Sequence, residues 1–225
     1  MLVPVRLGML SMILGGAAFA QSGPVTFESL VDGTVLSNQL SGTTFANAIV
    51  IGAGITLNEF EFPPHGGGNV ASDNGGPMTI VFASPLRGFS GYFTHSVPVT
   101  LQALDSANNL LATKTSASSN NEALSGASGS HPNELLEVRS STGIVKVVMT
   151  GSAQGTSFTL DDAALYTKCD VDLNGVTNVA DTQAILNEAL GAANAVDDLN
   201  ADGAVNVVDA QIVINAAMGS VCQAK

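Results

Sequence analysis

The sequence predicts an all-β sandwich with jelly-roll-like connections, followed by a small all-α domain. Short runs rich in Val, Ile, Thr and Phe recur between Gly, Asn, Ser and Pro turns over the first two thirds of the chain. Nearer the C-terminus, one pattern of Asp, Asn and Gly occurs twice, 28 residues apart, and an apolar helical pattern follows each copy. We therefore expect a β-sandwich domain at 21–167 and a second domain at 168–225.

The predicted sandwich rests on ten short runs between turn signals. In 88–94, Phe89 and Phe93 share one face while Ser90 and Tyr92 share the other, as in a half-buried strand. No segment of this domain has a convincing helical pattern. The expected strands lie at 25–30, 46–51, 56–62, 78–82, 88–94, 99–104, 110–115, 135–139, 145–150 and 157–160.

The chain begins with the features of a secretory signal peptide. Arg6 precedes an apolar run at 7–19, which is too short to span a bilayer comfortably. The Ala-Phe-Ala motif that ends at Ala20 is a cleavage site of the small-x-small type, so we expect residues 1–20 to be removed. A secreted, extracellular protein without a membrane span is the expected result.

Charge and motif content narrow the function. The chain has 7 Lys and Arg against 19 Asp and Glu, which gives a net charge of −12. Proteins that bind nucleic acids present basic patches, so we expect no nucleic-acid partner. No G-x-S-x-G, H-E-x-x-H, Walker or dinucleotide motif occurs, and no catalytic residue is predicted. A hydrolytic carboxylate pair is recognised by its separation in space, so glycoside hydrolysis stays open.

Each copy of the repeated pattern has the ligand spacing of an EF-hand calcium loop. Side-chain oxygens occupy loop positions 1, 3, 5, 9 and 12, glycine occupies position 6, and position 7 supplies a backbone carbonyl. Two ordinary acidic turns are the alternative, and two full-length matches at a fixed spacing argue against them. The predicted Ca²⁺ ligands are Asp170, Asp172, Asn174, Val176, Asn178 and Asp181 in loop 1 (170–181), and Asp198, Asn200, Asp202, Ala204, Asn206 and Asp209 in loop 2 (198–209).

A helix is expected after each loop, because apolar residues recur at helical spacing in 181–190 and 209–218. An asparagine before each helix is a suitable N-cap, and a glycine after each one is a suitable C′ residue. The stretch before each loop is too short or too polar for an entering helix. The expected caps are Asn178 and Gly191 for the first helix, and Asn206 and Gly219 for the second.

Paired loop–helix repeats without entering helices resemble the dockerin module of bacterial cellulosome-type systems. The resemblance covers about residues 169–222. It implies a compact domain with one calcium ion in each loop, which docks onto a cohesin domain of another protein in an extracellular assembly.

Dockerins often have Ser-Thr pairs where they contact the partner. Here the corresponding residues are Val179 and Ala180 in one repeat, and Val207 and Val208 in the other. We expect this apolar set to contact a different class of cohesin, or a segment of the same protein. The alternative is that these side chains are plain helix core.

Cys169 and Cys222 are the only cysteines, and they bracket the two repeats. A secreted chain meets an oxidising compartment, so we expect a disulfide that joins the two ends of the module. A free thiol pair or a metal site is the alternative, and no histidine lies near either cysteine in the sequence.

The first domain is similar to secreted bacterial β-sandwiches of the galactose-binding or carbohydrate-binding-module kind. The similarity rests on an opening Thr-Phe-Glu at 26–28 and a closing Ser-Phe-Thr-Leu-Asp-Asp at 157–162. It implies that the first and last strands meet around a structural calcium, with Glu28, Asp161 and Asp162 as candidate ligands. An exposed acidic pair at strand ends is the alternative.

Sugar sites usually offer flat aromatic platforms, and this chain has 2 Tyr and no Trp. The expected function is therefore a secreted, non-catalytic binding or interaction protein that its calcium-binding module attaches to a partner. The alternatives are a carbohydrate-binding accessory protein and a small glycoside hydrolase in polysaccharide catabolism.

Overall fold

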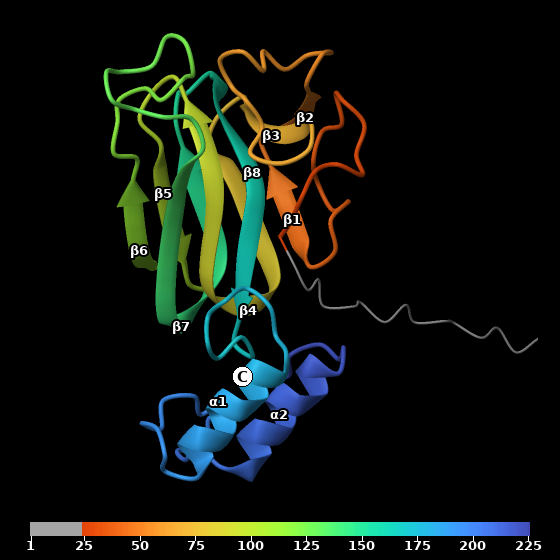
Figure 1. Cartoon of the computed structure of the whole chain (residues 1–225), viewed down its shortest axis with the longest axis vertical. Coiled ribbons are helices and arrows are strands. Elements are labelled where there is room, and N and C mark those ends of the chain that lie inside the picture. Colours follow the sequence, from red (N-terminus) through yellow and green to blue (C-terminus); the bar gives the residue numbers. More distant parts are fainter. Residues whose placement is uncertain (1–23) are drawn as a thin grey trace, which may run out of the picture.

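A computed structural model describes residues 24–225, so the predicted signal peptide lies outside the described residues. Figure 1 shows an antiparallel β domain with two helices at one end of it. The strands are β1 (Thr43–Ala46), β2 (Ala48–Gly52), β3 (Asn69–Asn74), β4 (Met78–His95), β5 (Thr100–Leu104), β6 (Leu110–Thr115), β7 (Glu134–Thr150) and β8 (Gly155–Thr167). The helices are α1 (Val179–Ala189) and α2 (Val207–Ala217).

Two layers arise because β4 and β7 are long strands that belong to both. The first half of β4 pairs with β1 and with the second half of β7, and β5 and β6 extend this layer. The second half of β4 pairs with β8 and with the first half of β7, and β3 and β2 extend that layer. The register of β4 against β7 shifts between Val81 and Gly88, where the strands pass from one layer to the other. This is the β-sandwich that the sequence predicts.

Apolar side chains from both layers fill the space between them. Phe89 and Phe93 are fully buried, as the alternation in their strand predicts. The Asp73 carboxylate is also buried in the sandwich. Asp73 accepts hydrogen bonds from the amide and hydroxyl of Ser157, both at 2.7 Å, and from the amide of Phe158 at 3.0 Å, so it ties β3 to β8. Other large core side chains are Phe27, Phe158, Met78, Ile80, Leu101, Leu136 and Met149.

Two of the strand predictions were wrong, and a third was correct in part. The segment 25–30 forms an isolated bridge at Val25 and then turns, and 56–62 is a turn in which Asn58 O accepts two amide hydrogen bonds. The segment 46–51 is divided between β1 and β2 by Asn47, whose φ is 55°. Strand β3 was missed because its polar residues do not show the apolar pattern of a buried strand.

The two helices form where the sequence predicts them, and in the described chain β8 leads directly into loop 1 without an entering helix. Each helix begins with a capping box, built on Asn178 in α1 and on Asn206 in α2. Leu190 and Met218, which we expected on the apolar faces, are exposed C-cap residues beyond the last turn. The helices share a small core of Cys169, Ile185, Leu199, Ala210 and Val213. We call residues 168–225 the loop–helix pair.

Candidate functional site

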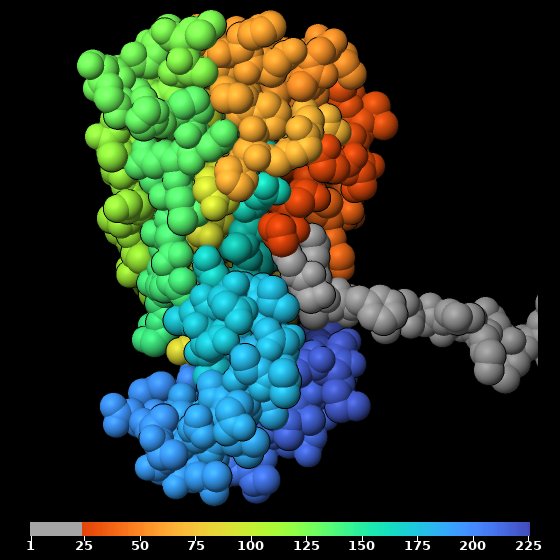
Figure 2. Space-filling model, viewed as in Figure 1, coloured from red at the N-terminus to blue at the C-terminus, as the bar shows by residue number. Residues whose placement is uncertain are grey.

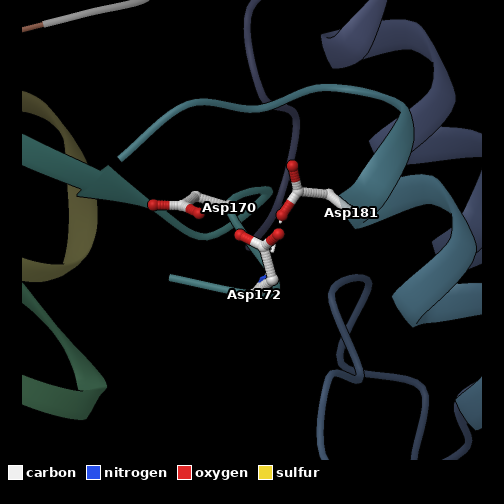
Figure 3. A group of neighbouring side chains, drawn as sticks. All are labelled: Asp170, Asp172 and Asp181. Atoms are coloured by element: carbon white, nitrogen blue, oxygen red, sulfur yellow. Dashed lines mark hydrogen bonds between the residues drawn. The ribbon is translucent and has the colours of Figure 1, made fainter. Parts of the chain in front are cut away.

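Loop 1 brings three carboxylates together. Asp170 follows β8, Asp172 lies in the loop, and Asp181 lies in the first turn of α1, and their ligand oxygens are within 4.8 Å of one another. Figure 3 shows Asp172 between the other two side chains. Within residues 24–225 this is the group of His, Cys, Asp or Glu side chains that has metal-ligand spacing.

Backbone amides hold these carboxylates in place. Asp170 accepts hydrogen bonds from the amides of Asn174 at 3.0 Å and Gly175 at 2.9 Å. Asp181 accepts from the amides of Asp172 at 3.0 Å and Asn178 at 2.8 Å. The first and last ligand positions of the loop are therefore fixed by the loop itself.

Loop 2 repeats these bonds at the same loop positions. Asp198 accepts from the amides of Asp202 at 3.1 Å and Gly203 at 2.7 Å. Asp209 accepts from the amides of Asn200 at 3.0 Å and Asn206 at 2.9 Å. Unrelated acidic turns would not share the bonds at each position, so the two loops are copies of one structural unit.

The backbone conformation also repeats. Loop position 4 has a positive φ in both copies, 59° at Leu173 and 57° at Ala201. Position 6 has φ values of 89° at Gly175 and 94° at Gly203, a region where glycine carries no steric cost. This is the sharp turn that the glycines were expected to allow.

The oxygens of loop 1 fit a hard cation. Burial raises the pKa of Asp170, the Gly175 amide opposes this shift, and the charge of Asp181 adds to it. At position 7, the Val176 carbonyl accepts a hydrogen bond at 3.0 Å from the side-chain nitrogen Nδ2 of Asn178, so positions 7 and 9 face each other. Calcium binds carboxylate, amide and carbonyl oxygens of this kind, and its charge would offset the crowding of the carboxylates.

The predicted contact residues at the helix starts are exposed. Val179, Val207 and Val208 have 79%, 74% and 50% of their surface accessible, and Ala180 is also exposed. They are therefore not helix core in this structure. Exposed apolar side chains therefore lie at the start of each helix, where the sequence predicts contact with a partner.

The structure contains the predicted disulfide. Cys169 and Cys222 are bonded, with a Cα–Cα distance of 5.8 Å and a sequence separation of 53 residues. Cys169 is fully buried in the small helix core. The bond joins the start of loop 1 to the tail that follows α2.

The loop–helix pair lies directly against one end of the sandwich (Figure 2). Arg87 on β4 forms an ion pair with Asp197, just before loop 2, at 2.5 Å. Burial raises the pKa of Asp197 to about 7, the carboxyl group of Glu188 adds to this shift, and Arg87 opposes it. A cavity of about 320 Å³ lies at the junction, lined from both sides by residues that include Phe82, Pro85, Leu86, Val176, Ala216 and Val221. The sequence offered no sign of this contact.

In the sandwich, the three predicted calcium ligands make hydrogen bonds to a neighbouring loop. Glu28 accepts hydrogen bonds from the amides of Gly68 and Asn69, and Asp161 accepts them from the amides of His65 and Gly66. Asp162 Oδ2 lies 2.7 Å from His65 Nδ1. These three carboxylates secure the 65–69 loop and do not form a group with metal-ligand spacing among residues 24–225. A calcium ion there stays a prediction.

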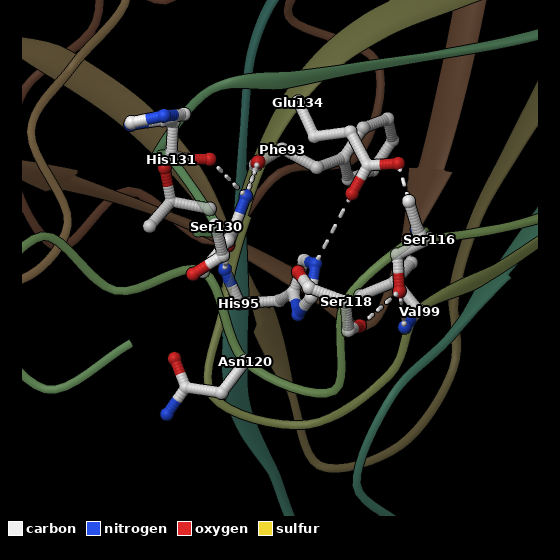
Figure 4. A network of polar contacts seen from close by, with 12 residues as sticks. Phe93, His95, Val99, Ser116, Ser118, Asn120, Ser130, His131 and Glu134 are labelled. Atoms are coloured by element: carbon white, nitrogen blue, oxygen red, sulfur yellow. Dashed lines mark hydrogen bonds and ion pairs between the residues drawn. The ribbon is translucent and has the colours of Figure 1, made fainter. Parts of the chain in front are cut away.

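A second polar cluster surrounds His95 (Figure 4). The His95 ring is fully buried, and its Nε2 lies 3.6 Å from Glu134 Oε2. Asn121 accepts a hydrogen bond from the His95 amide at 2.6 Å and donates to the carbonyls of Phe93 and His131. Burial lowers the pKa of His95, and Glu134 opposes that shift. We interpret the cluster as structural, because it fastens the 116–133 loop to β4.

Together, the fold and the repeated loops define the class: an antiparallel β-sandwich that carries a disulfide-closed pair of loop–helix repeats. No helix among residues 24–225 has the length and apolar character needed to cross a membrane. No protein-family model matches the chain, and no curated protein sequence matches it.

Several solved structures are similar to this chain over part of its length. The K1 cleaved adhesin domain of Lys-gingipain from Porphyromonas gingivalis has 8% identity and a TM-score of 0.41, covering 66% of this chain and 99% of that domain. TmCBM61 in complex with β-1,4-galactotriose has 14% identity and a TM-score of 0.35, covering 65% and 99%. CsCBM6-3 from Clostridium stercorarium in complex with cellobiose has 15% identity and a TM-score of 0.33, covering 59% and 92%.

Proposed function

We propose that the loop–helix pair binds two calcium ions and attaches the sandwich to a partner protein in an extracellular assembly. The sandwich is then a non-catalytic binding domain, and the pair is the element that docks it. The resemblance of the sequence at 169–222 to dockerins suggests a cohesin-type partner.

The observation that carries this proposal is the residue-by-residue repetition of the two loops. Each has the same acceptor aspartates at positions 1 and 12 and the same amide donors. Each also has five side-chain oxygen positions and a carbonyl at position 7, which is close to the about six to eight oxygens that calcium prefers. The disulfide fits an oxidising, extracellular setting.

Calcium binding is tested by isothermal titration of the chain 21–225 after chelator treatment. We expect two calcium ions per chain and no comparable response to Mg²⁺, which demands near-ideal octahedral geometry. The matched control is Asp170→Ala with Asp198→Ala, which removes the first ligand of both loops and should abolish the heat. A wild-type chain that binds no calcium would contradict the proposal.

Docking is tested by capture of purified cohesin domains of several classes on the immobilised chain, with calcium and with chelator. Calcium-dependent capture of at least one class is the expected result. Capture that is equal in chelator would show that the loops do not govern docking.

Carbohydrate binding by the sandwich is the second candidate. The favouring observation is an aromatic pair beside carboxylates: the His65 and Tyr92 rings stack with centroids 3.5 Å apart, and Asp162 contacts His65. Rings and carboxylates together are what sugar sites use. A glycan array compares the wild-type chain with His65→Ala; binding that the variant loses supports this candidate, and an array without signal removes it.

A further inference from the structure

We propose that the sandwich preorganises loop 1, so that the two loops bind calcium unequally and loop 1 binds it more tightly. This inference rests on the proposed calcium function of the loops. It assigns to the sandwich a role in metal binding that neither loop motif reveals.

The two loops have equal ligand sets, so the ligands themselves do not predict a difference. Loop 1 has three carboxylates and two asparagine amides at its five side-chain positions, and so does loop 2. The carbonyl at position 7 completes both sets. Affinity in such loops depends on ligand charge and on the rigidity of the site. With charge equal, rigidity decides.

The first difference in surroundings lies at loop position 8, which holds Thr177 in loop 1 and Val205 in loop 2. The Thr177 hydroxyl lies 3.2 Å from the hydroxyl of Thr167, the last residue of β8. Val205 instead packs against the small core of the loop–helix pair. Loop 1 thus exchanges an apolar contact within the pair for a hydrogen bond to the sandwich.

The second difference lies at the glycines of position 6. A methyl group added at Gly175 would lie 3.7 Å from the Tyr166 ring and 4.0 Å from the Ala164 side chain, both on β8. A methyl group added at Gly203 would meet nothing within 4 Å. The turn of loop 1 is therefore backed by the sandwich, and the turn of loop 2 faces solvent.

The third difference is burial of the first ligand. Asp170 is 1% exposed and follows the disulfide-bonded Cys169, which itself comes two residues after the end of β8. Asp198 is more exposed, and the residue before it, Asp197, forms an ion pair with Arg87 of the sandwich. The start and the turn of loop 1 are thus restrained before calcium arrives.

A restrained loop loses less conformational freedom when it binds a ligand. Each side chain that is already ordered before binding can raise the affinity by up to about tenfold. We therefore expect loop 1 to bind calcium about fivefold or more tightly than loop 2.

The experiment compares two full-length single-site variants by calcium titration. Asp198→Ala leaves loop 1 intact, and Asp170→Ala leaves loop 2 intact, so each removes the first ligand of one loop. Thr177→Val is then added to Asp198→Ala, and Val205→Thr to Asp170→Ala, because these changes exchange the residues of position 8. Circular dichroism of each variant checks that it is folded.

We expect tighter binding in Asp198→Ala, a severalfold loss when Thr177→Val is added, and little change from Val205→Thr. Equal affinities in the two single-site variants would overturn the inference and leave the calcium function intact. A wild-type chain without calcium binding would overturn both. If a ligand variant does not fold, calcium titration of the wild-type chain tests the inference. The two calcium-binding steps of the wild type should differ in affinity, and Thr177→Val alone should bring the two affinities together. Equal affinities in the wild type, or affinities that Thr177→Val does not change, would overturn the inference.

Discussion

Removal of the disulfide should unfold the loop–helix pair selectively. The bond closes a loop with a sequence separation of 53 residues. For a loop of this length, the chain-entropy relation gives about 14 cal/mol/K, which is about 4 kcal/mol at 25 °C. The core of the pair contains five buried apolar residues, so little other burial is available to offset that loss.

The perturbation is Cys169→Ala with Cys222→Ala, compared with the wild-type chain under oxidising and reducing conditions. Urea unfolding followed by helical circular dichroism should show the helices melting at lower urea in the variant and in the reduced wild type. The β transition should stay in place, because neither cysteine contributes to the sandwich core. Helices that melt at an unchanged urea concentration would refute the reasoning, and alkylation of both thiols in the non-reduced chain would refute the bond itself.

Three further predictions follow from buried or exposed groups. Asp73→Ala leaves three buried donors without their acceptor and should cost about 3 kcal/mol in urea unfolding, more than the isosteric Asp73→Asn; equal costs would contradict this. Burial holds the pKa of His95 below its usual 6.5, so the unfolded chain binds the proton first as pH falls. The contribution of His95 to stability should be fully present above about pH 6.5 and should be lost as pH drops through the folded pKa. Thermal-melting series of the wild type and His95→Gln should therefore differ in slope in this range, and equal slopes would refute this. Ala180→Asp with Val208→Asp should weaken partner capture by 2 kcal/mol or more, about thirtyfold, without loss of calcium affinity, because neither side chain is a predicted ligand; unchanged capture would exclude this face.

Local patterns predicted the parts of the structure that depend on local chemistry. The alternation that set Phe89 and Phe93 on one face of a strand was confirmed, because a half-buried strand needs that period. The helix caps were confirmed as well, because Asn178 and Asn206 satisfy amides within their own turn. The pairing of Cys169 with Cys222 required only that the two repeats bring their ends together.

Features that depend on distant contacts could not be predicted in this way. Strand β3 is held by its pairing with β2 and β8 and by Asp73, and its sequence alone resembles a polar turn. The ion pair of Arg87 with Asp197 joins the sandwich to the loop–helix pair, and neither residue lies in a sequence motif. Thr177 is an exception among these distant contacts, because an alignment of the two loops shows that Thr177 stands where loop 2 has Val205. The alignment does not show which residue Thr177 contacts.

The position of β8 in the sheet sets the order in which the protein can fold. β8 is the last strand of the sandwich in sequence, yet it lies between β3 and β4, and Ala71 on β3 pairs with Leu160. A chain that emerges N-terminus first must therefore hold its earlier strands uncovered until residues 155–167 arrive. Strand pairs between residues far apart in sequence form slowly, and the incomplete sheet exposes its strand edges until they form. Because loop 1 begins shortly after β8, completion of the sandwich and formation of loop 1 become consecutive steps.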